Sequence, residues 1–200
     1  LSQVDNGPTH LFKHSKFNSP LVKSWDISLM NKGSISAPVF SNQHVFILDS
    51  RANLYSFGLD GKKEWVLDLA PSLEKNQKTH HSGGIVLNKE NLFVATGFGE
   101  IFSINLDGSI NWKKRFDSPF RGAPIFSNNK IFVINANDLA IAVNKKGEII
   151  WTLQGPTRPT LLSKGISPAF KSNKLLLPFS AGQLTAVRPN NGAELWKVAF

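Results

Sequence analysis

A short pattern of turn, glycine and tryptophan occurs four times along the 200-residue chain at nearly even intervals. In each copy the glycine lies four residues before the tryptophan; the pairs are Gly61 and Trp65, Gly108 and Trp112, Gly147 and Trp151, and Gly192 and Trp196. Asp-Gly and Asn-Gly steps favour hairpin turns, because glycine adopts positive φ without steric cost. A hairpin signal at a fixed place in a repeat restricts the chain to an array of similar units.

Each unit also contains apolar runs of strand length before the tryptophan, which makes four short strands per unit. The expected strands are 37–40, 45–48, 54–57 and 64–67; 84–87, 92–95, 101–104 and 111–113; 123–126, 131–134, 139–143 and 150–153; and 167–170, 175–178, 184–187 and 195–198. No segment with helical periodicity competes with them. The sequence therefore predicts an all-β fold, a β-propeller with four-stranded antiparallel blades.

The repeat also predicts how the chain divides. We expect an irregular leader over 1–20, followed by a strand at 21–29 that carries Trp25 and closes another blade as its outer strand. The blades themselves are expected at 30–69, 70–114, 115–153 and 154–200. The array forms one repeat domain, because each unit buries its apolar faces only against its neighbours.

The five tryptophans are candidates for a sugar platform, a quinone stack or structural wedges. They are Trp25, Trp65, Trp112, Trp151 and Trp196. Their fixed place after a turn favours the structural interpretation, because a large indole recurring once per blade fills the wedge between adjacent sheets. We expect the last four to lie on outermost strands, largely buried between blades.

The net charge of +9 raises nucleic acid and anionic membranes as partners. The lysines are scattered over turns, however, which is typical of a solvated rim, and no nucleic-acid partner is predicted. The chain has no cysteine, and the adjacent His80 and His81 have no nearby carboxylate to complete a metal site. No metal, cofactor or catalytic residue is predicted.

Two connections between blades are expected to open on the same face, because they join the same two strand positions. The connection at 115–122 places Phe120 beside Arg121 just before the first strand of a blade, and the connection at 154–165 contains Arg158 and Lys164. Aromatic and arginine side chains are common anchors of protein interfaces. These two loops are therefore the candidate binding face.

Three longer stretches extend the pattern: 95–100 (ATGFGE), 121–124 (RGAP) and 177–182 (LPFSAG). Together with the turn, glycine and tryptophan repeat, they resemble the outer-membrane protein assembly factor B family, a propeller of the pyrroloquinoline-quinone type. The resemblance implies a ring of about eight blades, of which about four are present here. It also implies a non-catalytic periplasmic scaffold of the outer-membrane β-barrel assembly machine, associated with the outer membrane through a lipid anchor that this chain does not contain.

The resemblance further implies which residues bind the central subunit of that machine. Arg121 matches the family's contact arginine, with Ser118 and Phe120 in place of two apolar neighbours and Gly122 following it. The family's acidic contacts in the next connection fall at 163–165, where this chain has Ser163, Lys164 and Gly165. The second contact loop thus departs from the family's pattern.

Two other functions are compatible with such a repeat. A quinone-dependent dehydrogenase needs carboxylates at the centre of the ring, whereas Asp60 and Asp107 belong to turn motifs. A sensor or adhesion propeller that binds another ligand is also possible, because a fold does not fix function. Half a ring leaves apolar sheet faces uncovered at both ends, so we expect one of two arrangements. Either the chain is the first half of a longer protein, or two copies close the circle, each lending its Trp25 strand to the last blade of the other.

Overall fold

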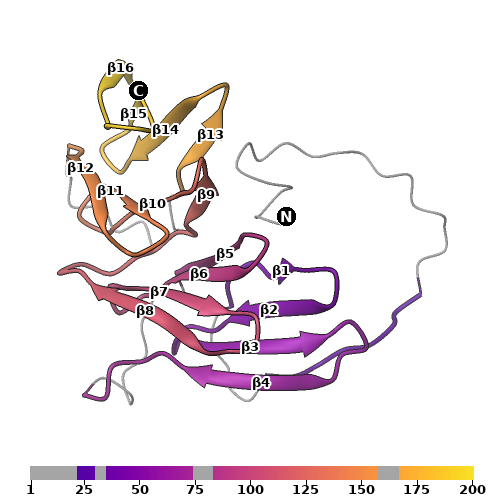
Figure 1. Ribbon diagram of the computed structural model, residues 1–200. Helices are drawn as coiled ribbons and strands as arrows, with labels where there is room; N and C mark the ends of the chain where they lie inside the picture. Colours follow the sequence, from indigo (N-terminus) through magenta and orange to yellow (C-terminus); the bar gives the residue numbers. More distant parts are fainter. Residues whose placement is uncertain (1–21, 30–34, 74–82, 157–166) are drawn as a thin grey trace.

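The computed structural model describes residues 22–29, 35–73, 83–156 and 167–200, which form four antiparallel sheets of four strands each (Figure 1). We call these sheets blades 1 to 4, in chain order. The described residues contain no helix, and therefore none long and apolar enough to cross a membrane. The all-β propeller fold predicted from the sequence is confirmed.

The strand bounds follow the predicted runs within one or two residues. Blade 1 has β1 (Val39–Phe40), β2 (His44–Leu48), β3 (Asn53–Gly58) and β4 (Lys63–Asp68), and blade 2 has β5 (Gly84–Leu87), β6 (Asn91–Ala95), β7 (Glu100–Asn105) and β8 (Ile110–Arg115). Blade 3 has β9 (Ile125–Ser127), β10 (Lys130–Ile134), β11 (Leu139–Asn144) and β12 (Ile149–Gln154), and blade 4 has β13 (Ala169–Lys171), β14 (Lys174–Phe179), β15 (Gln183–Val187) and β16 (Glu194–Ala199).

Each blade is a simple meander in which sequential strands are neighbours. In blades 2 and 3 the second and third strands are almost wholly buried, as in β6 and β7, because each of these blades lies between two others and packs on both faces. This explains why their sequences are continuous apolar runs rather than an alternation of apolar and polar residues. The outermost strands β4, β8 and β12 alternate instead between exposed and less exposed residues.

The tryptophan of every blade lies on its outermost strand, as predicted, and faces a small residue on the third strand. The paired residues are Ser56 and Trp65, Ser103 and Trp112, Ala142 and Trp151, and Ala186 and Trp196. The register shifts directly after the small residue in all four blades, which marks a β-bulge. The small side chain leaves room for the indole above it.

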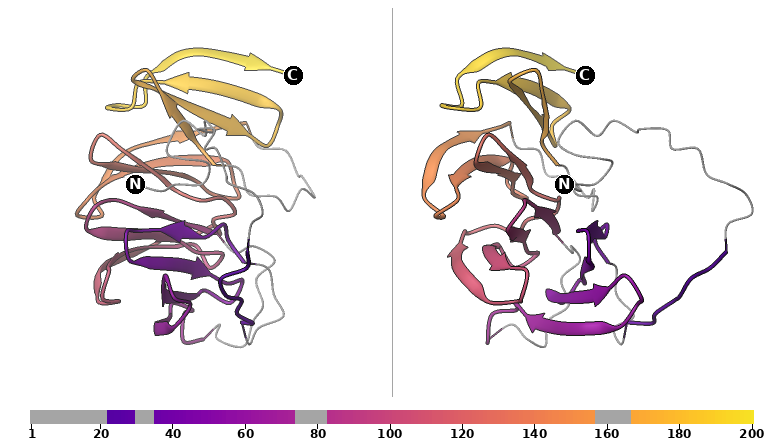
Figure 2. Two further views of the ribbon diagram at one scale, coloured as in Figure 1. Left: turned by 90° about the vertical axis from the view of Figure 1, so that its right-hand side faces the viewer. Right: turned by 45° about the vertical axis from the view of Figure 1, so that its right-hand side comes forward.

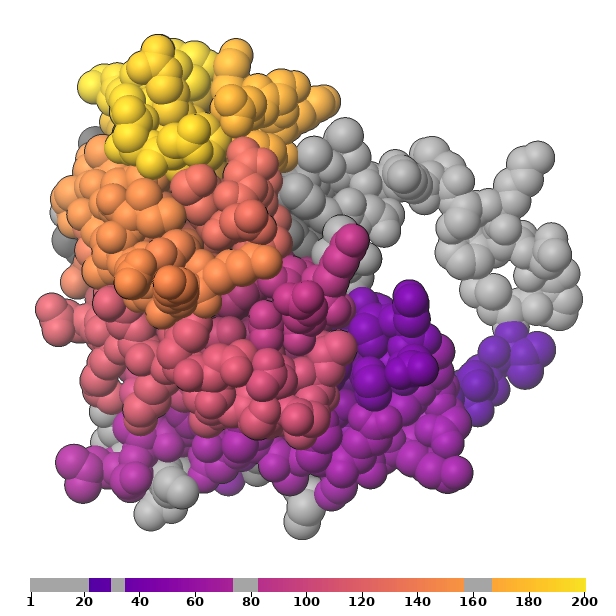
Figure 3. Space-filling view, viewed as in Figure 1, coloured from indigo at the N-terminus to yellow at the C-terminus, as the bar shows by residue number. Residues whose placement is uncertain are grey.

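The apolar core lies between blades rather than inside one sheet. One cluster joins blades 1 and 2, a second joins blades 2 and 3, and a third joins blades 3 and 4. The blades follow one another along an arc (Figure 2), and blade 4 forms the top of the molecule in Figure 3. Stability in such an array comes from interfaces between neighbours.

The segment before blade 1 pairs with none of the four described sheets. Residues 22–29 form no strand with the other described residues, so the expectation that 21–29 closes another blade as its outer strand stays a prediction. Trp25 nevertheless packs on blade 1, where its Nε1 donates a hydrogen bond to the Leu59 carbonyl oxygen at 2.8 Å. The predicted leader at 1–20 lies outside the described residues.

Candidate functional site

The meander gives the propeller two different faces. One end of each sheet carries the turns between its second and third strands together with the connection to the next blade; this end is here called the connection face. The other end, here called the turn face, carries the two remaining hairpins, including the turn with the repeated glycine. The first predicted binding loop belongs to the connection face, since 116–124 joins β8 to β9.

The connection at 116–124 is held by the blades on both sides of it. The backbone N–H of Phe116 donates to the Gly99 carbonyl oxygen at 2.8 Å, and that of Phe120 donates to the Thr96 carbonyl oxygen at 3.1 Å. On the other side, the Ala136 N–H donates to the carbonyl oxygen of Pro119 at 2.8 Å. The loop therefore keeps one shape between the turns of blades 2 and 3.

Gly99 makes this close approach possible. Its φ is +80°, and a β-carbon at this position would lie 2.7 Å from the carbonyl oxygen of Phe116 and 3.0 Å from that of Ser118. Any side chain would push the connection away from the β6–β7 turn. The Gly-Phe-Gly stretch at 97–99 is thus a structural turn that positions the connection at 116–124.

A cavity of about 420 Å³ opens between this turn and the connection. It is lined by Gly97, Phe98, Arg115, Phe116, Asp117, Ser118 and Pro119. The Ser118 hydroxyl is buried there, and no hydrogen-bond partner for its Oγ is found among the described residues. A buried hydroxyl without a partner costs about 1–3 kcal/mol, so it is normally satisfied by water or by a bound group.

Charged side chains flank the cavity. The Arg115 guanidinium is about half exposed, and its Nη1 lies 3.9 Å from an oxygen of Glu100, whose carboxylate is almost wholly buried. Asp117 lies on the rim beside them. The cavity therefore has positive and negative side chains at its rim, the unpartnered Ser118 hydroxyl, and the rings of Phe98 and Phe116 in its lining. Such a mixture is typical of protein interfaces, which have a polar rim and an apolar centre.

On the turn face, four of the five tryptophans each fit into a socket on the blade that follows them in the chain. The indole lies on the turn glycine of that blade, and Nε1 donates to a carbonyl of the same turn. The sockets pair Trp25 with Gly61 and Leu59, Trp65 with Gly108 and Leu106, Trp112 with Gly147 and Lys145, and Trp151 with Gly192 and Pro189, with hydrogen bonds of 2.8, 3.1, 2.7 and 3.0 Å. The repeated glycine of blades 2, 3 and 4 thus receives the tryptophan of the preceding blade, and that of blade 1 receives Trp25.

The family described as "Outer membrane protein assembly factor BamB" matches residues 59–200 of the chain. The chain belongs to this family. Its BamB-like repeats account for the recurring turn, glycine and tryptophan, and for the sockets that join one blade to the next.

Individual relatives are more distant. An uncharacterized protein of Rickettsia conorii is 23% identical over 92% of this chain and 45% of its own length. The structure of BamB from Moraxella catarrhalis superposes with a TM-score of 0.71 and 15% identity, covering 90% of this chain and 52% of that one. A quinohemoprotein alcohol dehydrogenase of Comamonas testosteroni superposes with a TM-score of 0.66 and 13% identity, covering 82% and 34%.

These likenesses show the propeller fold, which BamB and the dehydrogenase share. The chain spans about half the length of the curated relatives it matches. At such identities the structures carry no statement about activity.

The structure brings together the predicted contact residues of the first BamB-like loop but exposes them unequally. Arg121 is partly exposed, whereas Ser118 and Gly122 are buried. Phe120 is wholly buried in the cluster between blades 2 and 3, and its ring meets Phe116 edge to face at 5.5 Å. Phe120 therefore fixes the loop from inside rather than presenting an exposed ring, and its place in a binding face stays a prediction.

The second predicted contact loop cannot be compared with the structure, because Ser163, Lys164 and Gly165 lie outside the described residues. Arg158 lies outside them as well. The connection face is therefore described here through its first loop alone.

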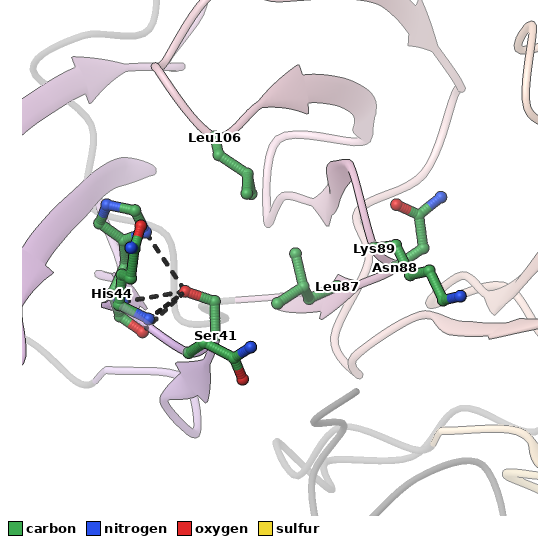
Figure 4. A pocket seen from close by; sticks show the side chains of 8 residues that line it. Ser41, His44, Leu87, Asn88, Lys89 and Leu106 are labelled. Atoms are coloured by element: carbon green, nitrogen blue, oxygen red, sulfur yellow. Dashed lines mark hydrogen bonds between the residues drawn. The ribbon is translucent and has the colours of Figure 1, made fainter.

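A second cavity, of about 540 Å³, opens on the turn face between blades 1 and 2 (Figure 4). It is lined by Ser41, Asn42, Gln43, His44, Leu87, Asn88, Lys89 and Leu106. His44 Nδ1 lies 3.2 Å from the Ser41 hydroxyl, and His44 Nε2 lies 3.3 Å from Glu64 Oε2. Serine, histidine and glutamate are the residue types of a nucleophilic triad, so this arrangement needs a chemical test.

Ser41 is a turn cap rather than an activated nucleophile. Its Oγ accepts the backbone N–H of His44 at 2.9 Å and that of Gln43 at 3.3 Å. Asn88 accepts backbone N–H groups at the corresponding turn of blade 2. The sequence analysis missed the pairing of His44 with Glu64. The available signal was that His44 and Glu64 occupy the two positions at which the next repeat has the uncharged Asn91 and Asn111.

The acidic residues of the repeated turns have the structural role that the sequence predicted. The Asp60 carboxylate accepts the Lys62 backbone N–H, and this bond, helped by the Lys62 side chain, holds the pKa of Asp60 below its usual value. The hydroxyl and backbone N–H of Ser109 lower the pKa of Asp107 in the same way. Both carboxylates stabilise hairpins in their charged form.

Proposed function

We propose that this chain is a non-catalytic scaffold that binds another protein through its connection face, as part of outer-membrane β-barrel assembly. The observation that carries the proposal is the connection at 116–124, which two blades hold rigid beside a cavity containing the buried, unpartnered Ser118 hydroxyl. A preformed loop of this kind lowers the conformational cost of binding. Membership of the BamB-like family supports the choice of a protein partner.

The central subunit of the β-barrel assembly machine is the proposed partner, and the periplasmic side of the outer membrane is the proposed location. Arg121 is the proposed contact, because it is partly exposed on the loop that Phe120 anchors. Arginine at the centre of an interface commonly carries a large share of the binding energy. Ser118 and Arg115 line the cavity beside the loop that carries Arg121.

The test is capture of the purified central subunit by the immobilised chain. Arg121→Glu is expected to weaken capture more than tenfold, about 1.4 kcal/mol, while the circular dichroism and melting curve stay unchanged. Lys171→Glu, a reversal of the same charge at the end of β13, is the matched control and should retain capture. Equal losses in both variants would show that positive charge acts generally, and the site would be wrong.

A dehydrogenase function is the second candidate, because a quinohemoprotein alcohol dehydrogenase shares the fold. The buried carboxylates already have structural roles in this chain. Asp49 accepts the Asn53 backbone N–H at 2.8 Å, and Asp138 accepts the Ser180 hydroxyl and backbone N–H across blades 3 and 4. Among the described residues no group of three or more histidine and acidic side chains could hold a metal ion.

Quinone-dependent dye reduction with alcohol substrates distinguishes the two candidates. Reduction above the rate of a heat-denatured sample would favour the dehydrogenase. Capture of the central subunit without dye reduction would favour the scaffold. If neither occurs, a sensor or adhesion propeller with another ligand becomes the better hypothesis.

A further inference from the structure

The charges of the turn face are distributed unevenly among the four blades. In blades 1 and 2, the hairpins of this face and the strand ends beside them carry three basic side chains and four acidic ones, which are Lys62, Lys63 and Lys89 against Asp60, Glu64, Glu90 and Asp107. In blades 3 and 4, the same positions carry six basic side chains and two acidic ones, which are Lys130, Lys145, Lys146, Lys171, Lys174 and Arg188 against Glu148 and Glu194. The six basic side chains of blades 3 and 4 are here called the basic surface.

The basic surface is not neutralised by neighbouring carboxylates. Five of its six residues are exposed, and Lys130 is partly buried. Among the described residues, none of the six lies within ion-pair distance of an acidic side chain. Glu148 accepts Asn144 Nδ2 instead, at 2.6 Å, and Glu194 lies 3.5 Å from Lys197 on its own strand. The positive charge is therefore available to an anionic partner.

Contacts between the hairpins join the basic side chains into one surface. The first strands of the two blades, β9 and β13, lie side by side (Figure 1). Between the hairpins that follow these strands, Asn128 Nδ2 donates to Asn173 Oδ1 at 3.4 Å. Lys130 Nζ donates to Asn190 Oδ1 at 3.0 Å, which ties the β9–β10 hairpin to the β15–β16 hairpin. The charges are thus held close together by the packing of blade 3 on blade 4.

Two exposed aliphatic side chains lie beside these charges. Ile149 and Ile150 directly follow the β11–β12 turn and are 45% and 38% exposed. They stay open although blade 3 has a described blade on either side and although the next residue, Trp151, is buried. The counterparts of Ile150 in blades 1 and 2 are the polar residues Glu64 and Asn111. Basic side chains next to exposed aliphatic ones are typical of surfaces that lie on a membrane.

We propose that the basic surface binds the anionic head groups of a lipid bilayer, with Ile149 and Ile150 entering the layer of head groups. Clustered lysine and arginine side chains are attracted to anionic lipid, and apolar side chains add affinity where they leave water. The hairpins project from one end of the sheets, rather than from the faces on which blades pack, so several of them can meet a flat surface together. The proposal goes beyond the proposed function, because the connection face lies at the opposite end of the same strands.

The side chains favour lipid over nucleic acid. Proteins that bind single-stranded nucleic acid combine basic residues with aromatic rings on which the bases stack. In blade 3, the Phe126 ring is partly buried and Lys145 Nζ lies over it, 5.7 Å from its centroid, while the exposed apolar neighbours are isoleucines. Isoleucine offers a base no ring to stack on, but it partitions readily into lipid.

Co-sedimentation with vesicles tests the proposal. The purified chain is expected to bind vesicles of an equal mixture of phosphatidylcholine and phosphatidylglycerol, to ignore vesicles of phosphatidylcholine alone, and to be largely released at about 0.5 M salt. Lys146→Glu combined with Lys174→Glu should weaken binding to the mixed vesicles by about tenfold or more. Lys63→Glu combined with Lys89→Glu makes the same change of charge on blades 1 and 2 of the same face and should weaken it by less than about threefold. Circular dichroism and melting curves should be unchanged in both.

Replacing the aliphatic residues separates insertion from charge. Ile149→Ser combined with Ile150→Ser keeps every charge and should weaken vesicle binding by about threefold or more. If this variant does not fold, Ile150→Asn introduces the residue that blade 2 has at this position and should act in the same direction. An unchanged affinity in the variant that folds would overturn the insertion of these side chains.

Three results would overturn the binding of lipid. The first is binding to mixed vesicles that is no stronger than binding to phosphatidylcholine alone at low ionic strength. The second is an equal loss in the two double lysine variants, which would show that net charge acts without a defined surface. The third is binding of a short DNA duplex or single strand through Lys146 and Lys174 without binding to vesicles, which would assign the surface to nucleic acid.

Discussion

The outermost strands of blades 3 and 4 have nearly the same geometry but very different surroundings. β12 and β16 have equal lengths, follow turns with the repeated glycine, and pair their tryptophans with Ala142 and Ala186. Trp151 is 8% exposed, because blade 4 covers it with Gly192, whereas Trp196 is 42% exposed. The difference shows that a tryptophan in this repeat is buried by the next blade, not by its own strand.

The largest effect is expected for Trp151→Ala. The indole is buried in the cluster between blades 3 and 4, and its Nε1 donates to the Pro189 carbonyl oxygen. Loss of this contact should lower the free energy of unfolding by about 3–5 kcal/mol, because it leaves a cavity and an unpaired carbonyl. Urea titration measures it, and a loss below about 1 kcal/mol would contradict the role of a buried wedge.

Trp112→Ala should have an intermediate effect of about 2–4 kcal/mol, because the indole is only partly buried although its socket is complete. Thermal unfolding followed by circular dichroism provides the measurement. A cost as large as that of Trp151→Ala would show that the hydrogen bond to Lys145, rather than burial, dominates the contact.

Substitution of the glycine tests the socket from the other side. Gly147 has a φ of +82°, and a β-carbon there would lie 2.9 Å from the Trp112 ring. Gly147→Ala should therefore cost about 1–3 kcal/mol through backbone strain and displacement of the indole. Gly182 also has a positive φ, +78°, but a β-carbon there would meet only the Phe200 carbonyl oxygen, at 3.3 Å. Gly182→Ala therefore measures the backbone strain without displacement of an indole. Equal costs for both variants would exclude displacement of the indole.

The smallest effect is expected for Trp196→Ala, measured at a concentration where the chain is monomeric. With no blade covering the indole among the described residues, its removal should cost less than about 1 kcal/mol. Acrylamide quenching should show correspondingly that Trp196 supplies most of the accessible fluorescence. A cost near that of Trp151→Ala in the monomer would mean that part of the same chain covers this face.

Much of the candidate site could be located from sequence, but its exposure could not. The repeat placed Arg121 and Phe120 on the connection before a first strand, where both are found. Phe120 turns inward because its backbone pairs with Thr96 and with Asn135 on neighbouring blades. Nothing in the local sequence distinguishes an inward from an outward phenylalanine, since that choice depends on contacts between blades.

The repeat pattern was enough to predict the meander of four strands, the place of each turn and the outer position of each tryptophan. These features follow from local chemistry: apolar runs form strands, and glycine permits the positive φ of the hairpin. Three properties depend instead on packing between blades: which tryptophans are covered, the place of Trp25 in a socket, and the burial of Ser118 beside a cavity. Those properties depend on neighbouring blades far apart in the sequence, whose packing no local pattern encodes.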